Sequence, residues 1–321
     1  MDHNEAALIP EVALASGIRM PVIGMGTASR NPLTDPILVQ AAIVEAIKAG
    51  YRHFDTAFGY RSEEPLGEAI AEALSSGLIG SRQELFITSK LWATAAEPHL
   101  VLPAIRTSLK SLKLEYMDLY LIHFPIKLDA DVRSVPPLEK KVHPLDIKSI
   151  WEAMEECQNM GLTKAIGVSN FSCKKLTELL SSAKIRPAVN QVEMSPAWHQ
   201  KQLGRFCKAN CIHITAYSPL GAPGTKWGDN RVLNSDVLQQ IAKAKGKSVA
   251  QISMRWLYEQ GVSVIPKSFN KERMRNNIEI FDWSLTEEEL HKIDQIPQHK
   301  CVLFVNNLGP TKFALELDAE I

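Results

Sequence analysis

Short apolar runs rich in β-branched residues alternate along this chain with longer amphipathic stretches. The eight apolar runs are residues 21–27, 51–57, 84–92, 117–124, 164–170, 188–194, 212–218 and 262–268. The amphipathic stretches are residues 36–49, 63–75, 98–112, 146–160, 172–182, 199–209, 248–259 and 270–280. This alternation predicts a parallel sheet built from strand–helix units, and eight units in 321 residues fit a closed (β/α)8 TIM barrel.

Several segments lie outside this alternation of predicted strands and helices. Residues 11–20 alternate around a Ser-Gly turn, which predicts an N-terminal β-hairpin before the first barrel strand. Two connections, 125–145 and 219–235, and the tail 297–321 are longer than simple strand–helix loops. Loops after barrel strands lie on the catalytic face, so we expect these three large C-terminal-face loops to shape a substrate pocket. The chain shows no other repeat and no linker-like tract, so residues 1–321 are expected to form a single domain.

The charge balance argues against several classes of partner. The chain has 36 Lys and Arg against 36 Asp and Glu, so no chain-wide field attracts nucleic acid or an anionic membrane. No apolar run reaches the roughly 18 residues of a membrane-spanning helix, and the first residues do not resemble a secretory signal. The five cysteines are odd in number and scattered, which favours reduced thiols. We therefore expect a cytoplasmic protein that binds neither nucleic acid nor membrane.

Every predicted strand ends in polar or ionisable side chains. In a parallel barrel these ends meet at one rim and point into the bowl that the following loops enclose. The strand-end residues are Thr27, Asp55, Lys90, His123, Ser169, Asn170, Gln191, Tyr217, Ser218, Lys267 and Ser268. Each residue alone has an ordinary explanation as a loop-anchoring group. The convergence of Asp55, Lys90 and His123 favours a functional site, because opposing charges buried together need a mutual arrangement to be stable.

Tyr60 follows Asp55 by five residues, in the loop before the next predicted helix. It is either an aromatic residue of the rim or a general acid. A phenol, with a reference pKa of about 10, donates a proton poorly near neutrality unless a cation such as Lys90 favours phenolate. If Asp55 orients Lys90 and His123 donates a hydrogen bond to the substrate, the set suits protonation of a carbonyl oxygen as hydride arrives. The chain has no GxSxG or HExxH motif and no carboxylate cluster for a metal.

The start of the last predicted helix has the composition of an anion site. Lys267, Ser268 and Arg273 surround a helix start capped by Ser268 or Asn270, which combines cations with free backbone N–H groups. A phosphate suits this site, although a charged surface helix has the same pattern. Tyr217 offers a ring face for stacking. No GxGxxG follows the first predicted strand, so the Rossmann mode of dinucleotide binding is not indicated.

Six segments together resemble the aldo-keto reductases over nearly the whole chain. They are GYRHFDTAFGYRSEEPLGEAI (50–70), MDLYLIHF (117–124), AIGVSNF (165–171), VNQVEMSP (189–196), TAYSPLG (215–221) and IPKSFNKERMRNN (265–277). Other segments, such as AMEECQNMGL and GKSVAQISMRW, are similar to the plant branch of that family. The resemblance implies NADPH as the cofactor, an aldehyde or ketone as the small-molecule substrate, and a monomer.

The resemblance also implies a role for each matching residue. Asp55, Tyr60, Lys90 and His123 would form a catalytic tetrad, with Tyr60 as the proton donor. Cofactor contacts would come from Gly26, Thr27, Asp55, Ser169, Asn170, Gln191, Tyr217, Ser218, Leu220, Lys267, Ser268, Phe269, Asn270, Arg273 and Asn277. In that set, the carboxamide would be bound by Ser169, Asn170 and Gln191, and Tyr217 would stack on the nicotinamide. The 2′-phosphate would be held by Lys267, Ser268, Arg273 and Asn277.

The substrate stays open at this stage. Candidate walls of its pocket are Ala28, Trp92, Phe124, Trp198 and Trp227. Ala28 stands where many animal members of the family carry a Trp, which suggests a roomier pocket, and Asn276 stands where several carry an acid near the adenine. The plant branch handles sugar acids, alkaloids and polyketides. A uronic acid would need a cation in the bowl, and the candidates are Arg61, Lys127, Arg133, Lys226 and Arg231.

Two other functions are compatible with such a barrel. Some relatives are channel subunits or lens proteins that keep the cofactor without catalysis, but four competent tetrad residues argue against that function. A phosphate-handling barrel isomerase would turn over without any nicotinamide. Cofactor binding and NADPH consumption distinguish the three possibilities.

Overall fold

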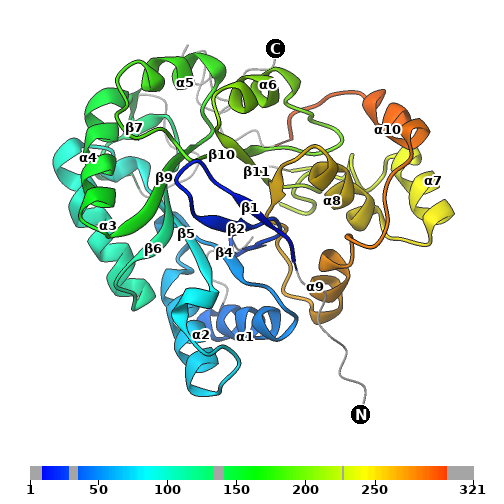
Figure 1. Cartoon of the computed structure of the whole chain (residues 1–321), viewed down its shortest axis with the longest axis horizontal. Coiled ribbons are helices and arrows are strands. Elements are labelled where there is room, and N and C mark those ends of the chain that lie inside the picture. Colours follow the sequence, from blue (N-terminus) through cyan, green and yellow to red (C-terminus); the bar gives the residue numbers. More distant parts are fainter. Residues whose placement is uncertain (1–8, 29–34, 133–140, 226–227, 302–321) are drawn as a thin grey trace.

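The structure is a computed structural model that describes residues 9–28, 35–132, 141–225 and 228–301 (Figure 1). The barrel strands are β3 (Met25–Gly26), β4 (His53–Asp55), β5 (Phe86–Leu91), β6 (Met117–Ile122), β9 (Thr163–Ser169), β10 (Val189–Glu193), β11 (His213–Tyr217) and β12 (Ser263–Val264). They form one parallel sheet in the order β12-β11-β10-β9-β6-β5-β4-β3. A parallel bridge between Ile23 and Val264 joins the two outer strands and closes the sheet. The expected (β/α)8 barrel is therefore confirmed.

The helices lie around the outside of this sheet (Figure 1). Those that were expected are α1 (Pro36–Lys48), α2 (Glu63–Ser75), α3 (Pro98–Leu112), α4 (Ile147–Asn159), α5 (Cys173–Leu180), α6 (Lys201–Ala209), α8 (Val249–Glu259) and α9 (Lys271–Ile278). Two further helices, α7 (Asp236–Lys245) and α10 (Glu287–Asp294), add to the eight strand–helix units. Short polar side chains start several of them: the Asp35 carboxylate accepts from the Ile37 N–H at 2.9 Å, and Ser248 forms a capping box with Gln251.

The expected N-terminal hairpin is present. Strands β1 (Glu11–Ala13) and β2 (Arg19–Pro21) pair antiparallel, with Gly17 at φ 84° in the turn. Leu14 and Met20 of this hairpin are buried against residues at the start of β5, β6 and β10. The hairpin therefore covers the end of the barrel opposite the strand-end polar residues, and burial of each such side chain contributes roughly 1.5–3 kcal/mol.

The segment 125–145, expected as a loop, contains a second hairpin. Strands β7 (Ile126–Leu128) and β8 (Val142–Pro144) pair antiparallel. Ile126, Leu128 and Val142 pack with Ala93 of the 3-10 turn η3 (Ala93–Ala95). Alternation of these apolar residues with polar ones was too short to predict a strand from the sequence.

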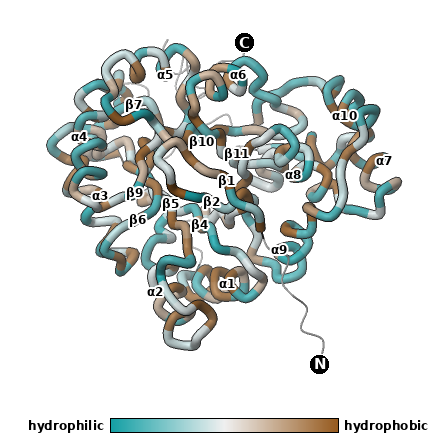
Figure 2. The backbone as a smooth tube through the Cα atoms, in the orientation of Figure 1, coloured by the Kyte–Doolittle hydropathy of each residue, from teal (hydrophilic) through white to brown (hydrophobic). Residues whose placement is uncertain are grey.

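The core fills the barrel and the space between the sheet and its helices. Every residue of β5 and β6 is buried, as expected of parallel strands covered on both faces. Figure 2 shows hydrophobic segments along the inner strands and more hydrophilic ones on α6 and α9. Across the described residues, no helix combines the length and apolar character that crossing a lipid bilayer requires.

Candidate active site

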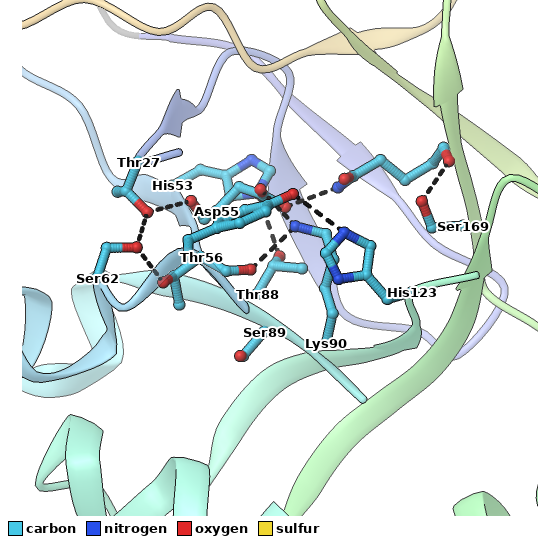
Figure 3. Close-up of polar contacts among 12 residues, drawn as sticks. Thr27, His53, Asp55, Thr56, Ser62, Thr88, Ser89, Lys90, His123 and Ser169 are labelled. Atoms are coloured by element: carbon cyan, nitrogen blue, oxygen red, sulfur yellow. Dashed lines mark hydrogen bonds and ion pairs between the residues drawn. The ribbon is translucent and has the colours of Figure 1, made fainter. Parts of the chain in front are cut away.

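Four residues expected in a tetrad meet at the C-terminal rim of the barrel, and Figure 3 labels three of them, Asp55, Lys90 and His123. Asp55 ends β4, Tyr60 ends the 3-10 turn η1 (Phe58–Tyr60), Lys90 lies in β5, and His123 directly follows β6. Lys90 Nζ lies 2.6 Å from Asp55 Oδ1 and 4.8 Å from the centroid of the Tyr60 ring. The Tyr60 hydroxyl lies 3.2 Å from His123 Nε2, at hydrogen-bonding distance. The barrel topology thus gathers an ammonium, a carboxylate, a phenol and an imidazole into one cluster.

The turn that carries Tyr60 is fixed by buried hydroxyl groups. Tyr60 is followed by Arg61, whose φ of 56° turns the chain into α2. The Ser62 hydroxyl then lies 2.7 Å from Thr27 Oγ1 and 2.8 Å from Thr56 Oγ1, and Thr27 donates to the Asp55 carbonyl at 2.9 Å (Figure 3). Neither Ser62 nor Thr56 was expected in the site from the sequence. The feature of the sequence that could have identified Ser62 and Thr56 is their closeness in the chain to Tyr60 and Asp55.

Burial dominates the electrostatics of the cluster. It raises the pKa of Tyr60 well above its usual value of 10, and the charge of Asp55 adds to the rise. It lowers the pKa of His123 well below 6.5, and the charge of Lys90 adds to that fall. Burial also lowers the pKa of Lys90, opposed by Asp55 and Glu63. At neutral pH Tyr60 therefore keeps its proton and His123 is uncharged.

These directions differ from the expectation that Lys90 lowers the pKa of Tyr60. The Lys90 ammonium donates to Asp55 and, at 2.9 Å, to the Thr56 carbonyl. Its charge is therefore directed at two acceptors other than the phenol. Desolvation of a phenolate at this position outweighs the attraction that remains.

Aromatic side chains form a wall beside His123. The ring of Phe124 stacks on the imidazole with centroids 4.6 Å apart, and the ring of Trp92 meets it edge to face at 5.3 Å. A Cβ added to Gly59, next to Tyr60, would lie 2.8 Å from the Trp92 ring. Trp92 therefore packs against both the turn of Tyr60 and the ring of His123. Trp92 and Phe124, two of the residues expected to line a pocket, thus both contact the ring of His123.

A chain of hydrogen bonds links the ends of β9, β10 and β11 to Asp55. The Tyr217 hydroxyl donates to Asn170 Oδ1 at 2.7 Å, and Asn170 Nδ2 donates to Ser169 Oγ at 3.1 Å. The Ser169 hydroxyl donates to the Gln191 carbonyl at 2.8 Å, and Gln191 Nε2 donates to Asp55 Oδ2 at 2.7 Å. The residues expected to bind a carboxamide therefore lie together, beside the tetrad.

The residues expected to bind an anion lie at the start of α9. Asn270 is the helix cap, since its side chain accepts from the Arg273 N–H at 2.9 Å. Ser268 Oγ accepts from the Asn270 N–H at 3.1 Å and from Arg273 Nε at 3.4 Å. The ammonium of Lys267 lies 3.8 Å from the centroid of the Phe269 ring. Two cations, hydroxyl and amide groups and a helix N-terminus thus share one short segment.

The remaining residues expected near a cofactor occupy varied positions. Gly26 lies so close to the chain that follows β12 that a Cβ on Gly26 would be 3.0 Å from the Ile265 carbonyl oxygen. Ser218 has a φ of 50°, and Leu220 packs partly buried against the main core. Asn277 is buried near the other end of α9, one helical turn after Arg273, and hydrogen-bonds the Tyr51 side chain.

The other expected pocket residues are only partly described. Ala28 and Trp198 are half-buried, and Trp198 forms a short antiparallel bridge after β10. Trp227, Arg133 and Lys226 lie outside the residues that the structure describes. Within the described ranges, no three His, Cys, Asp or Glu side chains gather as a metal ion would require.

The barrel and the cluster at its rim define the class of protein. The Aldo/keto reductase family matches residues 22–298, and the chain belongs to this family. The chain is 61% identical to D-galacturonate reductase of Fragaria ananassa, over 98% of this chain and 100% of the relative. It is 59% identical to NADPH-dependent codeinone reductase 1-4 of Papaver somniferum, over 94% of each. The resemblance to the plant branch is therefore confirmed.

A solved structure shows the same fold. The crystal structure of a Bombyx mori aldo-keto reductase in complex with NADP is similar with a TM-score of 0.84 and 38% identity. The match covers 92% of this chain and 96% of that one.

Proposed function

We propose that this protein is an NADPH-dependent reductase that converts an aldehyde or ketone into an alcohol, with Tyr60 as the general acid. The observation that carries this proposal is the meeting of the Tyr60 hydroxyl with His123 Nε2, at 3.2 Å, beside the buried pair of Lys90 and Asp55. A carbonyl oxygen within hydrogen-bonding distance of both the phenol and the imidazole receives hydrogen bonds from groups held by the protein.

The chain's own residues fit a dinucleotide phosphate. Ser169, Asn170 and Gln191 offer amide and hydroxyl groups for a carboxamide, and Tyr217 offers its ring. The Asn270-capped start of α9, with its nearby cations, suits a phosphate. When bound, NADPH supplies the hydride. The protein's part is to orient the carbonyl compound, exclude water and deliver a proton.

Tyr60 delivers that proton. As charge develops on the carbonyl oxygen, the oxygen becomes a far stronger base than a phenolate, so transfer from a neutral Tyr60 is favourable. The raised pKa of Tyr60 keeps the proton in place until then. After transfer, Tyr60 is a phenolate whose ring centroid lies 4.8 Å from the Lys90 ammonium, which stabilises the new charge. The proposed role of Lys90 is therefore to stabilise the phenolate that forms after proton transfer.

His123 acts as a neutral group. Its low pKa keeps the imidazole uncharged at neutral pH, so it orients the substrate oxygen through a hydrogen bond and does not compete as a strong acid. Stacking on Phe124 and edge contact with Trp92 hold its ring in place.

The substrate class is best sought among compounds with a carboxylate. Lys127 is paired with Glu97, and Arg231 with Asp229 at 2.9 Å. Arg61 is exposed, adjoins Tyr60 and makes no ion pair with any described residue. We therefore propose Arg61 as a cation for a substrate carboxylate, and D-galacturonate, named for a 61% identical relative, as the first compound to compare with a bulky cyclic ketone.

We further propose that residues 1–321 act as one domain, that the protein is a monomer and that it works in the cytoplasm. All five cysteines are thiols, as a reducing compartment would keep them. Size-exclusion chromatography coupled to light scattering tests the monomer, because a larger mass at micromolar concentration contradicts it.

The direct test of the proposed function is NADPH consumption with an aromatic aldehyde, followed by detection of the alcohol. Turnover that requires both compounds supports the reductase. Tight NADPH binding without turnover, on any aldehyde, ketone or sugar acid supplied, supports a non-catalytic cofactor-binding protein instead. Isomerisation of a sugar phosphate without nicotinamide overturns the proposal.

A further inference from the structure

Glu63 is a buried acid outside the bowl. It is the first residue of α2, and only 4% of it is exposed. The Ser89 hydroxyl donates to Glu63 Oε1 at 2.6 Å, and Ser108 of α3 supplies a second side-chain hydrogen bond. Burying a carboxyl group costs free energy unless its oxygens are hydrogen-bonded. The hydrogen bonds from Ser89 and Ser108 therefore stabilise Glu63 in its buried position.

This acid lies directly behind the tetrad. Ser89 and Lys90 are neighbours in β5, and successive side chains of a strand point to opposite faces. Lys90 therefore reaches Asp55 in the bowl, whereas Ser89 reaches Glu63 in the layer of helices. Figure 3 shows the Ser89 side chain pointing away from the residues around Lys90. One hydrogen bond thus fastens α2 to the back of the strand that carries Lys90.

This hydrogen bond lies close in the chain to Tyr60, which comes three residues before Glu63. Ser62 between them is held from the bowl side by the hydroxyls of Thr27 and Thr56. Farther along α2, a Cβ on Gly67 would lie 2.6 Å from the Leu112 carbonyl, so α2 and α3 are in close contact. The start of α2 is therefore held from the bowl, from β5 and from α3.

We propose that Glu63 is a positioning residue, whose hydrogen bond with Ser89 fixes the turn of Tyr60 relative to Lys90 and so sets the geometry of proton delivery. This inference rests on the proposed role of Tyr60. Glu63 touches neither substrate nor cofactor in this account. Its effect reaches the reaction through the main chain of residues 60–63 and through β5.

In this proposal, Glu63 positions Tyr60 through its hydrogen bond with Ser89 and not through its charge. Burial raises the pKa of Glu63, opposed by hydrogen bonds from Ser89 and Ser108 and by the charge of Lys90. Lys90 of β5 and Tyr120 of β6 are the titratable groups that interact with this carboxyl. A glutamine at this position keeps an oxygen that accepts from Ser89, whereas an alanine does not.

The test compares Glu63→Ala, Glu63→Gln and Ser89→Ala with a matched control. The control is Glu155→Ala, because Glu155 of α4 is also buried and accepts from the N–H groups of Lys184 and Ile185 at 2.7 and 2.8 Å, away from the bowl. For each variant we would measure kcat for an aldehyde, KM, the Kd for NADPH and the melting temperature. Glu63→Gln and Ser89→Ala keep the test usable if Glu63→Ala does not fold.

We expect Glu63→Ala to lower kcat by about tenfold to a hundredfold, the scale on which small misplacements act, with the Kd for NADPH unchanged. Glu63→Gln should restore kcat, and Ser89→Ala should lower it. The double variant Glu63→Ala/Ser89→Ala should be no slower than Glu63→Ala, because both remove the same bond. Glu155→Ala should lose melting temperature but keep kcat.

Three results overturn the inference: a parental kcat in both Glu63→Ala and Ser89→Ala, a Glu63→Gln as slow as Glu63→Ala, or an equal loss of kcat in Glu155→Ala. Failure of the proposed function looks different. A Tyr60→Phe variant with parental turnover overturns the role of Tyr60, whereas loss of turnover in Tyr60→Phe with full activity in the Glu63 and Ser89 variants overturns only the positioning role.

Discussion

Lys90 and Asp55 form an ion pair at the base of the bowl, with Nζ 2.6 Å from Oδ1 and their side chains 0% and 2% exposed. The other carboxylate oxygen accepts from Gln191 Nε2 at 2.7 Å, and Lys90 also donates to the Thr56 carbonyl. These extra hydrogen bonds are what allow two opposite charges to stay buried. The buried pair therefore contributes to stability as well as to the proposed active site.

Asp55→Asn keeps the shape of the side chain but leaves the Lys90 ammonium buried beside a neutral amide. Removing one partner of a buried pair costs about 3–5 kcal/mol, and we expect a loss of this size in the free energy of unfolding, measured by urea denaturation. The double variant Asp55→Asn/Lys90→Met removes both charges and should be more stable than Asp55→Asn. A double variant that is less stable than Asp55→Asn contradicts this account of the pair.

A second prediction concerns His213, whose Nε2 lies 3.2 Å from the Ser263 N–H and accepts its hydrogen bond. Burial and the neighbouring His53 lower the pKa of His213 from 6.5 to about 4. The unfolded chain therefore takes up this proton more readily than the folded protein. The stability that depends on this group is complete above pH 6.5 and falls as the pH approaches 4, by about 3 kcal/mol.

His213→Gln removes this titration. Its free energy of unfolding should decline between pH 6.5 and 4 by about 3 kcal/mol less than that of the parent. The pKa of His53 is also lowered by burial, so part of the pH dependence should remain. Denaturant titrations at a series of pH values give both curves, and parallel curves would show that His213 is not responsible.

Much of the fold and of the tetrad could be predicted because both depend on patterns local in sequence. The alternation of strands and helices predicts a barrel. A barrel brings the ends of its strands together, so Asp55, Lys90 and His123 are expected to meet. Tyr60 was found because it follows Asp55 closely.

The parts that could not be predicted depend on packing between distant segments. The direction of the Tyr60 pKa shift follows from burial, which a sequence pattern does not measure. The choice of Asp55 as the partner of Gln191 and of Tyr51 as the partner of Asn277 also depends on how distant segments pack. The hairpin of β7 and β8 was too short to leave a clear alternation.

A third prediction concerns Gly59. Its lack of a side chain lets Trp92 approach the turn that carries Tyr60. Gly59→Ala would place a Cβ 2.8 Å from the Trp92 ring, which must then shift and disturb His123. We expect kcat to fall by about tenfold. Gly204→Ala is the control, since a Cβ there meets no atom within 4 Å, and it should keep kcat and gain slightly in melting temperature. Parental kcat in Gly59→Ala would argue against the role of this contact.

The phosphate site proposed at the start of α9 predicts which cofactor the protein prefers. Arg273→Ala should raise the Kd for NADPH by about tenfold to a hundredfold, because a charge-assisted hydrogen bond to a phosphate is lost. The Kd for NADH, which has no 2′-phosphate, should change little. Arg275→Ala, an exposed cation on the same helix, is the control and should affect neither value. Equal weakening of NADPH and NADH by Arg273→Ala would place the 2′-phosphate elsewhere.

The central claim is that the Tyr60 hydroxyl delivers the proton, and the turnover of Tyr60→Phe tests it most directly. This change removes one oxygen and keeps the ring. We predict that kcat for aldehyde reduction falls by about 100-fold to 10,000-fold, with the Kd for NADPH and the melting temperature of the parent retained. A Tyr60→Phe protein that binds NADPH normally and reduces the aldehyde as fast as the parent would contradict the account.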